Sequence, residues 1–299
     1  MEIYVDKIEV KNELLEECSW KSLMESHEAE LAVLLDPYLK KRSMQQKDPV
    51  LDFLFEYYAF RPSHLRRWTP GIGVSLEFSE TSELPEVSEL TISDQFAYLD
   101  PGHFPKKRIK SLRWTLNLLK KSAGKKPLFG CFGMHEWAMV YRAGEVRHEQ
   151  IPFRLSDDEI AEFVESRPLL CTHFDAFRFF TEKAKPMNRN ELSREKFQGM
   201  EQPGCLHTNM DLYKWAYKFY PWISSELIRK AFFNAVETRK VDMQASPYDA
   251  REFDLEPIKI ETEEGRKMYL NKQTEIFERS MPIRNELIEA LGDLLTRVS

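Results

Sequence analysis

The chain is 299 residues long, with 42% hydrophobic residues, 31% charged residues and a formal net charge of −6. This composition is typical of a globular protein with a sizeable core, and the acidic balance gives the whole molecule no general attraction to nucleic acid. Only 11 residues are glycine, and no G-x-G-x-x-G or G-x-x-x-x-G-K-[ST] sequence is present, which excludes the common glycine-rich phosphate loops.

The amino terminus, residues 1–9, alternates charged and apolar side chains. It has the features of neither a signal peptide nor a transit peptide, and no apolar run approaches the roughly 18 residues that span a bilayer. The four cysteines are unevenly spaced in a long chain, which does not suggest a disulfide framework. We therefore expect a cytoplasmic protein with reduced thiols and no membrane partner, while the oligomeric state stays open.

Two helices are expected in the first 60 residues. Apolar and aromatic residues recur at helical spacing between Ser19 and Arg42, and Pro37 is expected to kink or split that helix. Asp48 followed by Pro49 is typical of a helix start, with Asp as the N-cap and Pro at the first helical position. The apolar residues that follow them surround the helix axis, which predicts a deeply buried helix.

A small β element is expected next. Pro70-Gly-Ile-Gly73 predicts a turn, and the alternation over 74–78 predicts a strand. Residues 80–95 are polar and predict a loop or a strand with an excursion, and residues 96–99 predict another short strand. Residues 128–142 begin like a strand and become helical near His135.

The remainder of the chain is predicted to be helical. Ser156 to Glu159 has the sequence of a capping box. The other expected helices are 104–124, 176–180, 193–202, one from Thr208 or Asn209 through Tyr220, one from Ser224 to Gln244, and 261–297 with an interruption at Met281-Pro282. The chain is therefore predicted to be a mainly α protein (α+β), a single compact helical domain over 1–299 with a small β element within about 70–155.

Three short segments each place a cysteine within four residues of a histidine. They are Cys131 to His135, Cys171 to His173, and Cys205 to His207. The whole chain has only seven histidines, and a carboxylate stands close to each of these three: Glu136, Asp175 and Asp211. Such groups bind metals, move protons or hold polar substrates. The functional hypothesis is that the three segments meet at one pocket.

A metal site is one interpretation of these segments, with His135, His173 and His207 as ligands of zinc or non-haem iron. The pair His173-Phe-Asp175 has the H-x-D spacing of a facial triad. No zinc-protease H-E-x-x-H motif is present, because Met139 and Val140 stand where the second histidine would be needed. The alternative is that the histidines make local hydrogen bonds and that Asp175 caps a helix.

Asp211 and Lys214 lie one turn apart on a predicted helix. An acid and an amine in this arrangement can serve as acid and nucleophile, as in base-excision chemistry, or can form a surface ion pair. No C-x2-4-C pair is present, so the cysteines are interpreted as buried structural thiols.

Basic residues are concentrated in two places. Residues 106–126 contain nine lysines and arginines and no acid, which makes this segment a candidate for binding nucleic acid or, alternatively, a solvated helix face. Arg66, Arg67 and Trp68 follow the second helix, where they can hold a phosphate and stack on a base, or end a helix.

Several longer phrases resemble one bacterial family. They are Asp48-Pro-Val-Leu-Asp-Phe-Leu-Phe with Arg61-Pro and Leu65-Arg-Arg-Trp-x-Pro-Gly, Gly130-Cys-Phe-Gly-Met-His-Glu-Trp-Ala-Met-Val-Tyr-Arg142, Cys171-Thr-His-Phe-Asp-Ala-Phe-Arg-Phe-Phe-Thr181, Gln202-Pro-Gly-Cys-Leu-His, Met210-Asp-Leu-Tyr-Lys-Trp-Ala-Tyr-Lys218, and Asp242-Met with Ala245-Ser-Pro-Tyr-Asp249. Over about residues 48–265 the chain is similar to the family labelled 3-methyladenine DNA glycosylase. The resemblance implies a hydrolase of DNA repair that acts as a DNA base N-glycosylase.

The candidate residues for such a reaction come from the same segments. The catalytic candidates are His135, Glu136, Asp175, Asp211 and Lys214. The substrate-binding candidates are Arg66, Arg67 and Trp68 together with the motif arginines Arg142 and Arg178. Pro70 to Gly73 is also similar to the hairpin of helix–hairpin–helix glycosylases, which would put a catalytic acid near Asp94, whereas the alternation over 74–78 favours a strand.

Two other functions stay open from sequence. One is a metal-dependent enzyme that uses the histidine and carboxylate segments to lower the pKa of bound water or activate oxygen. The other is a non-catalytic helical binding protein in which those residues brace the core.

Overall fold

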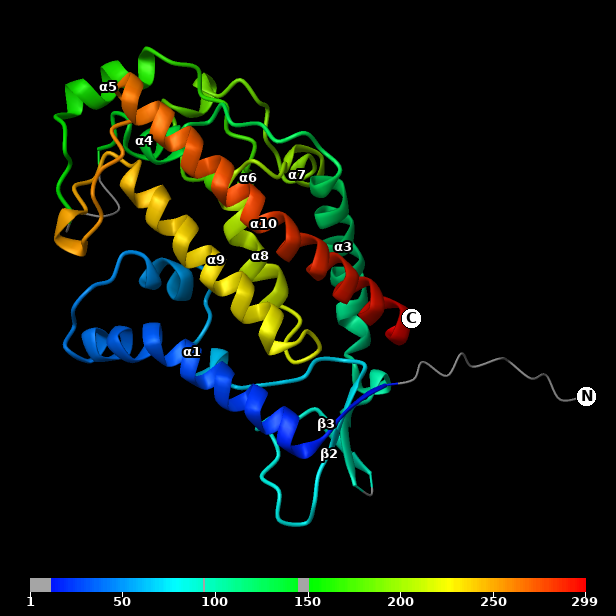
Figure 1. Cartoon of the computed structure of the whole chain (residues 1–299). Coiled ribbons are helices and arrows are strands. Elements are labelled where there is room, and N and C mark those ends of the chain that lie inside the picture. Colours follow the sequence, from blue (N-terminus) through cyan, green and yellow to red (C-terminus); the bar gives the residue numbers. More distant parts are fainter. Residues whose placement is uncertain (1–11, 94, 145–150) are drawn as a thin grey trace, which may run out of the picture.

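The computed structural model describes residues 12–93, 95–144 and 151–299 (Figure 1). Residues 1–9 and Asp94, to which predictions were attached, lie outside the described residues. The described chain is mainly helical with one four-stranded sheet, so the predicted fold class is confirmed. No described helix is both long enough and apolar enough to cross a membrane.

The centre of the molecule is a group of three long helices. They are α8 (Leu206–Tyr217), α9 (Ser225–Gln244) and α10 (Glu263–Val298), which pack on one another. α3 (Ile109–Ala123) lies against α10, and α1 (Glu17–Ser43) lies against α9 on the other side (Figure 1). Short helices close the end opposite the sheet: α4 (Met134–Val140), α5 (Asp157–Glu165), α6 (Phe174–Phe177) and α7 (Phe197–Met200).

Neither α1 nor α10 is split at its proline, so the split considered at Pro37 and the interruption predicted at Pro282 are wrong. α1 continues past Pro37 and α10 continues past Pro282. A proline inside a helix removes one hydrogen bond and crowds the preceding turn. In α10 this cost is offset because residues on both sides of Pro282 are buried on the core, among them Ile276 and Leu287.

The start of α8 differs from its prediction in a way that matters for the site. Cys205 is the N-cap, so His207 belongs to the first turn and Thr208 or Asn209 is not the cap. The predicted caps of α5 and α9 are confirmed, since the side chains of Ser156 and Ser224 accept backbone hydrogen bonds there.

The second predicted helix is observed as one helical turn followed by a short π-helix, Phe53–Tyr57. Asp48 caps the preceding turn as predicted, because its Oδ1 accepts hydrogen bonds from the backbone of Val50 and Leu51, whereas the N-cap of the π-helix itself is Asp52. The rings of Phe53 and Tyr57 stack with their centroids 4.9 Å apart. This stacked pair reaches the candidate site described below.

The sheet has the order β1-β2-β4-β3, formed by Glu13–Leu15, Val74–Glu77, Phe96–Leu99 and Leu90–Ser93. β1 runs parallel to β2, and the other neighbours are antiparallel. The strands predicted over 74–78 and 96–99 are confirmed, and the turn at Gly71 and Gly73 leads into β2 rather than into a helix. The helix–hairpin–helix similarity is therefore wrong. Where a strand was expected at the start of 128–142, residues 128–129 have no regular structure and 130–133 form a turn.

The structure corrects the substrate-binding roles predicted for Arg66 and Trp68. The Trp68 ring is buried and stacks on Trp20 at a centroid distance of 6.5 Å, under the sheet. Arg66 forms ion pairs with Glu28 and Asp36 of α1. Both side chains therefore hold α1 against the segment that follows the short helix α2 (Pro62–Leu65) and leads into the sheet, and the buried Trp68 ring is not available for stacking on a substrate.

This role of Trp68 predicts a stability effect. Trp68→Ala should lower the free energy of unfolding by about 3–5 kcal/mol, because a fully packed aromatic ring is replaced by a cavity. The matched control is Trp114→Ala, since the Trp114 side chain is 38% exposed and should lose far less. Urea unfolding measures both variants, and equal stability losses would contradict the packing role.

Candidate active site

The three histidine segments meet inside the molecule. His207 in α8 lies between the other two, with ring centroids 4.5 Å from His135 of α4 and 5.1 Å from His173. All three side chains are buried. His173 stands just before α6, and the left-handed residue Gly133 stands just before α4. Each of the three histidines therefore lies at or just before the start of a helix, and these helix starts bring the imidazole rings together.

At one end of this histidine row, a buried chain of charges runs from α4 to α9. His135 Nε2 lies 2.7 Å from Asp242 Oδ1, and His135 Nδ1 lies 3.6 Å from Cys131 Sγ. Arg239, one turn before Asp242, bonds the second oxygen of Asp242 and also donates to Glu136 Oε1 at 2.7 Å. Glu136 makes no other side-chain hydrogen bond within the described chain.

These contacts fix the protonation of the pair. Burial alone would lower the pKa of His135, but the charge of Asp242 and its hydrogen bond, assisted by Cys131, raise it well above the ordinary value. For Asp242, burial acts to raise the pKa, and the charges of His135 and Arg239 lower it instead. The pair is therefore an imidazolium and a carboxylate at neutral pH.

At the other end of the row, His173 lies among three carboxylates. Its Nδ1 is 2.7 Å from Glu201 Oε1, and its Nε2 is 3.9 Å from Asp211 Oδ2. Lys214 Nζ bridges Asp211 at 3.2 Å and Asp175 at 3.0 Å. Burial lowers the pKa of His173, but the charges of Glu201 and Asp211 raise it overall.

Tyr58 and Lys214 complete the second end. Tyr58 donates a hydrogen bond of 2.8 Å to Asp211 Oδ1. Burial opposes the charge on Lys214, yet Asp211 and Asp175 raise the pKa of its ammonium group above the usual range. Because a protonated amine is no nucleophile, Lys214 acts as a half-buried cation here, and the nucleophile predicted from sequence is not supported. The helix-cap interpretation of Asp175 is also wrong, since its carboxylate pairs with Lys214 and Arg178.

His207 in the middle of the row is neutral. Burial and the positive charges of His135 and His173 lower its pKa well below the ordinary value, and Asp242 offsets this only in part. Its Nδ1 is buried without a hydrogen-bond partner in the described chain. Two imidazoles with raised pKa values thus flank a neutral imidazole whose protonation they oppose.

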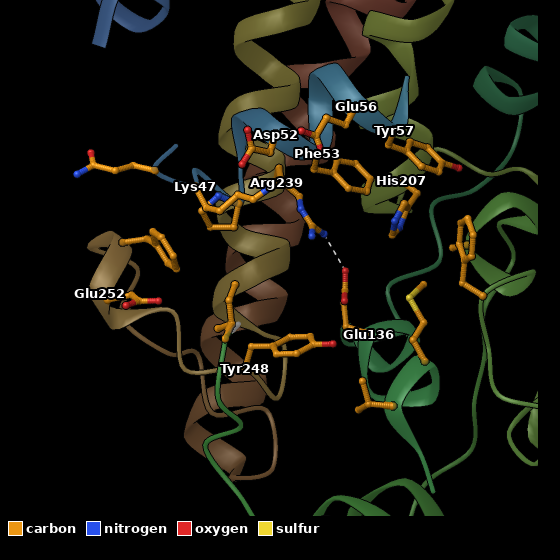
Figure 2. Close-up of a pocket in the computed structure, with 18 of the residues that line it drawn as sticks. Lys47, Asp52, Phe53, Glu56, Tyr57, Glu136, His207, Arg239, Tyr248 and Glu252 are labelled. Atoms are coloured by element: carbon orange, nitrogen blue, oxygen red, sulfur yellow. Dashed lines mark hydrogen bonds and ion pairs between the residues drawn. The ribbon is translucent and has the colours of Figure 1, made fainter. Parts of the chain in front are cut away.

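A cavity of about 1040 Å³ opens onto the His135 end of the row. Figure 2 shows Arg239 and Glu136 pointing toward each other, with His207 beside this pair. Aromatic residues form much of the wall: Phe53, Tyr57, Phe179, Tyr248 and Phe253. Charged residues also line it, namely Lys41, Lys47, Asp52, Glu56 and Glu252. The cavity combines a ring-lined wall with a polar group of defined geometry.

Two groups of side chains have donor atoms close enough for a metal ion. They are His135 with His207 and Asp242, and His173 with Asp175 and Asp211, and within each group the atoms lie within 4.8 Å of one another. Each group already contacts an internal cation, Arg239 in the first and Lys214 in the second. A divalent ion would have to share those carboxylates with a fixed positive charge, so the fit is unfavourable in this arrangement.

The remaining predicted site residues lie outside the row. Arg142 pairs with Glu165 of α5 on the surface, at 2.6 Å. Arg67 makes no side-chain hydrogen bond or ion pair within the described chain. Arg178 contacts Asp175 at 3.1 Å but faces a second groove on the far side of α6.

Sequence reasoning assigned no site role to Arg239, Asp242, Glu201 or Tyr58, although Asp242 belongs to one of the phrases that resemble the family. Arg239 and Asp242 stand three positions apart on a helix that is otherwise largely buried. An ion pair at this spacing on an apolar face was the available signal. Glu201 and Tyr58 carried no comparable signal, because each meets its partner only in the folded chain.

Comparison of this chain with family models, with curated proteins and with solved structures finds no match. The functional argument therefore depends on the geometry of the histidine row and of the cavity.

The pair of Asp242 with His135 and Arg239 can be tested by one substitution. Asp242→Asn should lower the free energy of unfolding by about 3–5 kcal/mol, because it leaves two buried cations without their carboxylate. The pKa of His135, followed by NMR, should fall. The control Asp293→Asn breaks the surface pair with Arg297 and should cost less than about 1 kcal/mol. An unchanged His135 titration would contradict the assignment.

The neutral state of His207 predicts how stability depends on pH. Its pKa is lower in the folded than in the unfolded protein, so its contribution is present above the unfolded value, near 6.5, and is lost as the pH falls. Stability should therefore decline below pH 6.5 by about 1.4 kcal/mol per pH unit for each such histidine. Buried His27, whose pKa is lowered to about 4, acts in the same direction.

His207→Gln should remove one proton from this dependence, whereas the exposed His103→Gln should leave it unchanged. Denaturant midpoints at pH 5, 6 and 7 measure the slope for each protein. An equal slope in His207→Gln and the parent would show that His207 is not held neutral.

Proposed function

We propose that the protein is an enzyme that acts on a nucleobase-type substrate in the cavity, and that its reaction is hydrolysis of an N-glycosidic bond. The observation that carries this proposal is the position of Glu136, held by Arg239, beside the neutral His207 in an aromatic-walled cavity. The sequence resemblance to a base glycosylase family points to the same class of reaction.

The cavity walls favour a flat, polar ring. Phe53 and Tyr57 present stacked rings from the π-helix, and Arg239 lies over the Phe53 ring at 4.2 Å. Aromatic side chains hold an extruded base by stacking, and polar groups at the pocket end bind its edge. A volume of about 1040 Å³ accommodates a base with its sugar.

The polar end supplies the groups that hydrolysis needs. Departure of a base leaves positive charge on the sugar, which a carboxylate such as Glu136 stabilises. Water adds to the anomeric carbon while it donates a hydrogen bond to the neutral His207, and it releases its proton to solvent. The departing base nitrogen takes up a proton from solvent. The C–N bond breaks, a C–O bond forms, and no oxidant or reductant is needed.

Arg239 and Asp242 act on this reaction through their neighbours. Arg239 fixes one oxygen of Glu136, and Asp242 anchors both Arg239 and His135. They are positioning residues rather than groups that touch the substrate.

All four cysteines are unpaired, which fits the reducing cytoplasm expected from sequence.

A metal-dependent enzyme is the second candidate, favoured by the two groups of close donor atoms. In that case zinc or non-haem iron would require the pair of His135 and Asp242 to separate and His135 to lose a proton. Elemental analysis of untagged protein after incubation with zinc or iron(II) distinguishes the candidates, since one metal per chain would support this one and reject the metal-free site.

Base excision tests the main proposal. Alkylated DNA and free modified nucleosides are incubated with the full chain, and released base is measured by chromatography. Glu136→Gln should lower the rate at least about 100-fold, because the substitution removes the charge that stabilises the sugar cation. The control Glu162→Gln changes an exposed glutamate of α5 and should leave the rate unchanged.

Two results would overturn the proposal. One is the absence of release from all of these substrates by protein that is folded and metal-free. The other is a release rate that is the same in Glu136→Gln as in the parent.

A further inference from the structure

A second groove of about 900 Å³ lies on the opposite side of α6 from the cavity. Its walls come from the start of α3 and the turn before it, from α6 and the residue after it, from the end of α8, and from Arg194 and Phe197 before and at the start of α7. The lining residues are Lys107, Lys110, Ser111, Trp114, Phe174, Asp175, Arg178, Arg194, Phe197, Trp215 and Lys218. The groove thus joins basic and aromatic side chains from four distant parts of the sequence.

The groove has an excess of positive charge on an acidic protein. Five of its lining residues are cationic, and Asp175 is the single carboxylate among them. That carboxylate is already neutralised by Lys214 and Arg178. Lys107 and Lys110 are exposed and have no acidic partner within the described chain. Burial and the nearby charges of other cations lower the pKa of Lys218.

Lysines near the end of the basic segment 106–126 differ from those that line the groove, because they are bound to other parts of the protein. Lys125 bonds the backbone oxygens of Gly199 and Glu201, and Lys121 lies 3.4 Å from Gln198. Those lysines attach α3 to the α7 region. Of the cations in the basic segment, only Lys107 and Lys110 line the groove.

Aromatic rings lie among these cations. Trp114 is 38% exposed, and its ring centroid lies 5.6 Å from Phe197 and 5.7 Å from Trp215. The ammonium of Lys218 lies 5.3 Å from the Trp215 ring centroid. An exposed indole that is braced from behind by two rings is a platform on which a flat ring can stack.

We infer that this groove binds single-stranded nucleic acid, with phosphates on the cations of Lys107, Lys110 and Lys218 and a base stacked on Trp114. A positively charged groove with interleaved aromatic side chains is the usual means of holding a single strand. A duplex keeps its bases stacked on one another and offers none to Trp114. The inference concerns a site separate from the cavity and does not depend on the reaction that the cavity performs.

Binding is measured with the full chain and a fluorescein-labelled thymidine oligonucleotide, by anisotropy in a salt series from about 20 to 200 mM. Trp114→Ala should weaken binding about tenfold, since one base loses its stacking partner. Trp114→Phe should restore most of the affinity. A double-stranded oligonucleotide of the same length should bind more weakly than the single strand.

The lysines predict a separate change. Lys107→Gln and Lys110→Gln should each reduce the slope of log affinity against log salt by about 0.7, because each removes one phosphate contact. The matched control is Lys120→Gln, an exposed lysine in the last turn of α3 that does not line the groove. It should leave both affinity and slope unchanged.

Three outcomes would overturn the inference. They are no binding at the lowest salt, an equal effect of Lys120→Gln and Lys110→Gln, and a Trp114→Ala affinity equal to that of the parent. The Glu136→Gln variant should bind the oligonucleotide as the parent does. Loss of excision with intact binding therefore reports on the cavity, and loss of binding with intact nucleoside hydrolysis reports on the groove.

Discussion

The constraint on which the structure depends is the neutralisation of carboxylates buried around the histidine row. Glu136, Glu201, Asp211 and Asp242 are each at most 5% exposed, and an isolated carboxylate in such surroundings would be strongly unfavourable. The matching cations come from different helices: Arg239 from α9, Lys214 from α8 and the imidazolium of His135 from α4. The network therefore sets how these helices must lie, as well as providing the polar end of the cavity.

α8 shows how one helix meets this constraint on two faces. His207, Asp211 and Lys214 recur at helical spacing and face the histidine row. Asn209, on another face, donates to Pro203 O and accepts from the buried Arg284 of α10. Because polar groups on both faces find partners inside the protein, α8 is almost wholly buried without being apolar. A sequence with this distribution of polar residues resembles an exposed helix start.

That distribution explains which parts of the site were predictable from sequence. The meeting of the three histidines was an expectation from their shared pattern, and most helices followed from apolar spacing and caps. The cap of α8 was predicted wrongly because Thr208 and Asn209 are typical cap residues whose side chains instead bond Glu201 and Arg284. Asp242 stands 107 residues from His135, and only the folded backbone brings them together.

α6 divides the functional surface into two regions of different chemistry. Ala176 and Phe179 belong to the cavity wall, whereas Phe174, Asp175 and Arg178 belong to the groove. Asp175 is the link between them, because it accepts Lys214 from the interior and Arg178 from the surface. Its charge is thereby cancelled on the groove side, and the groove stays positive beside an interior rich in carboxylates. α6 is only four residues long. It can still separate these regions because ion pairs and aromatic rings hold it on both sides.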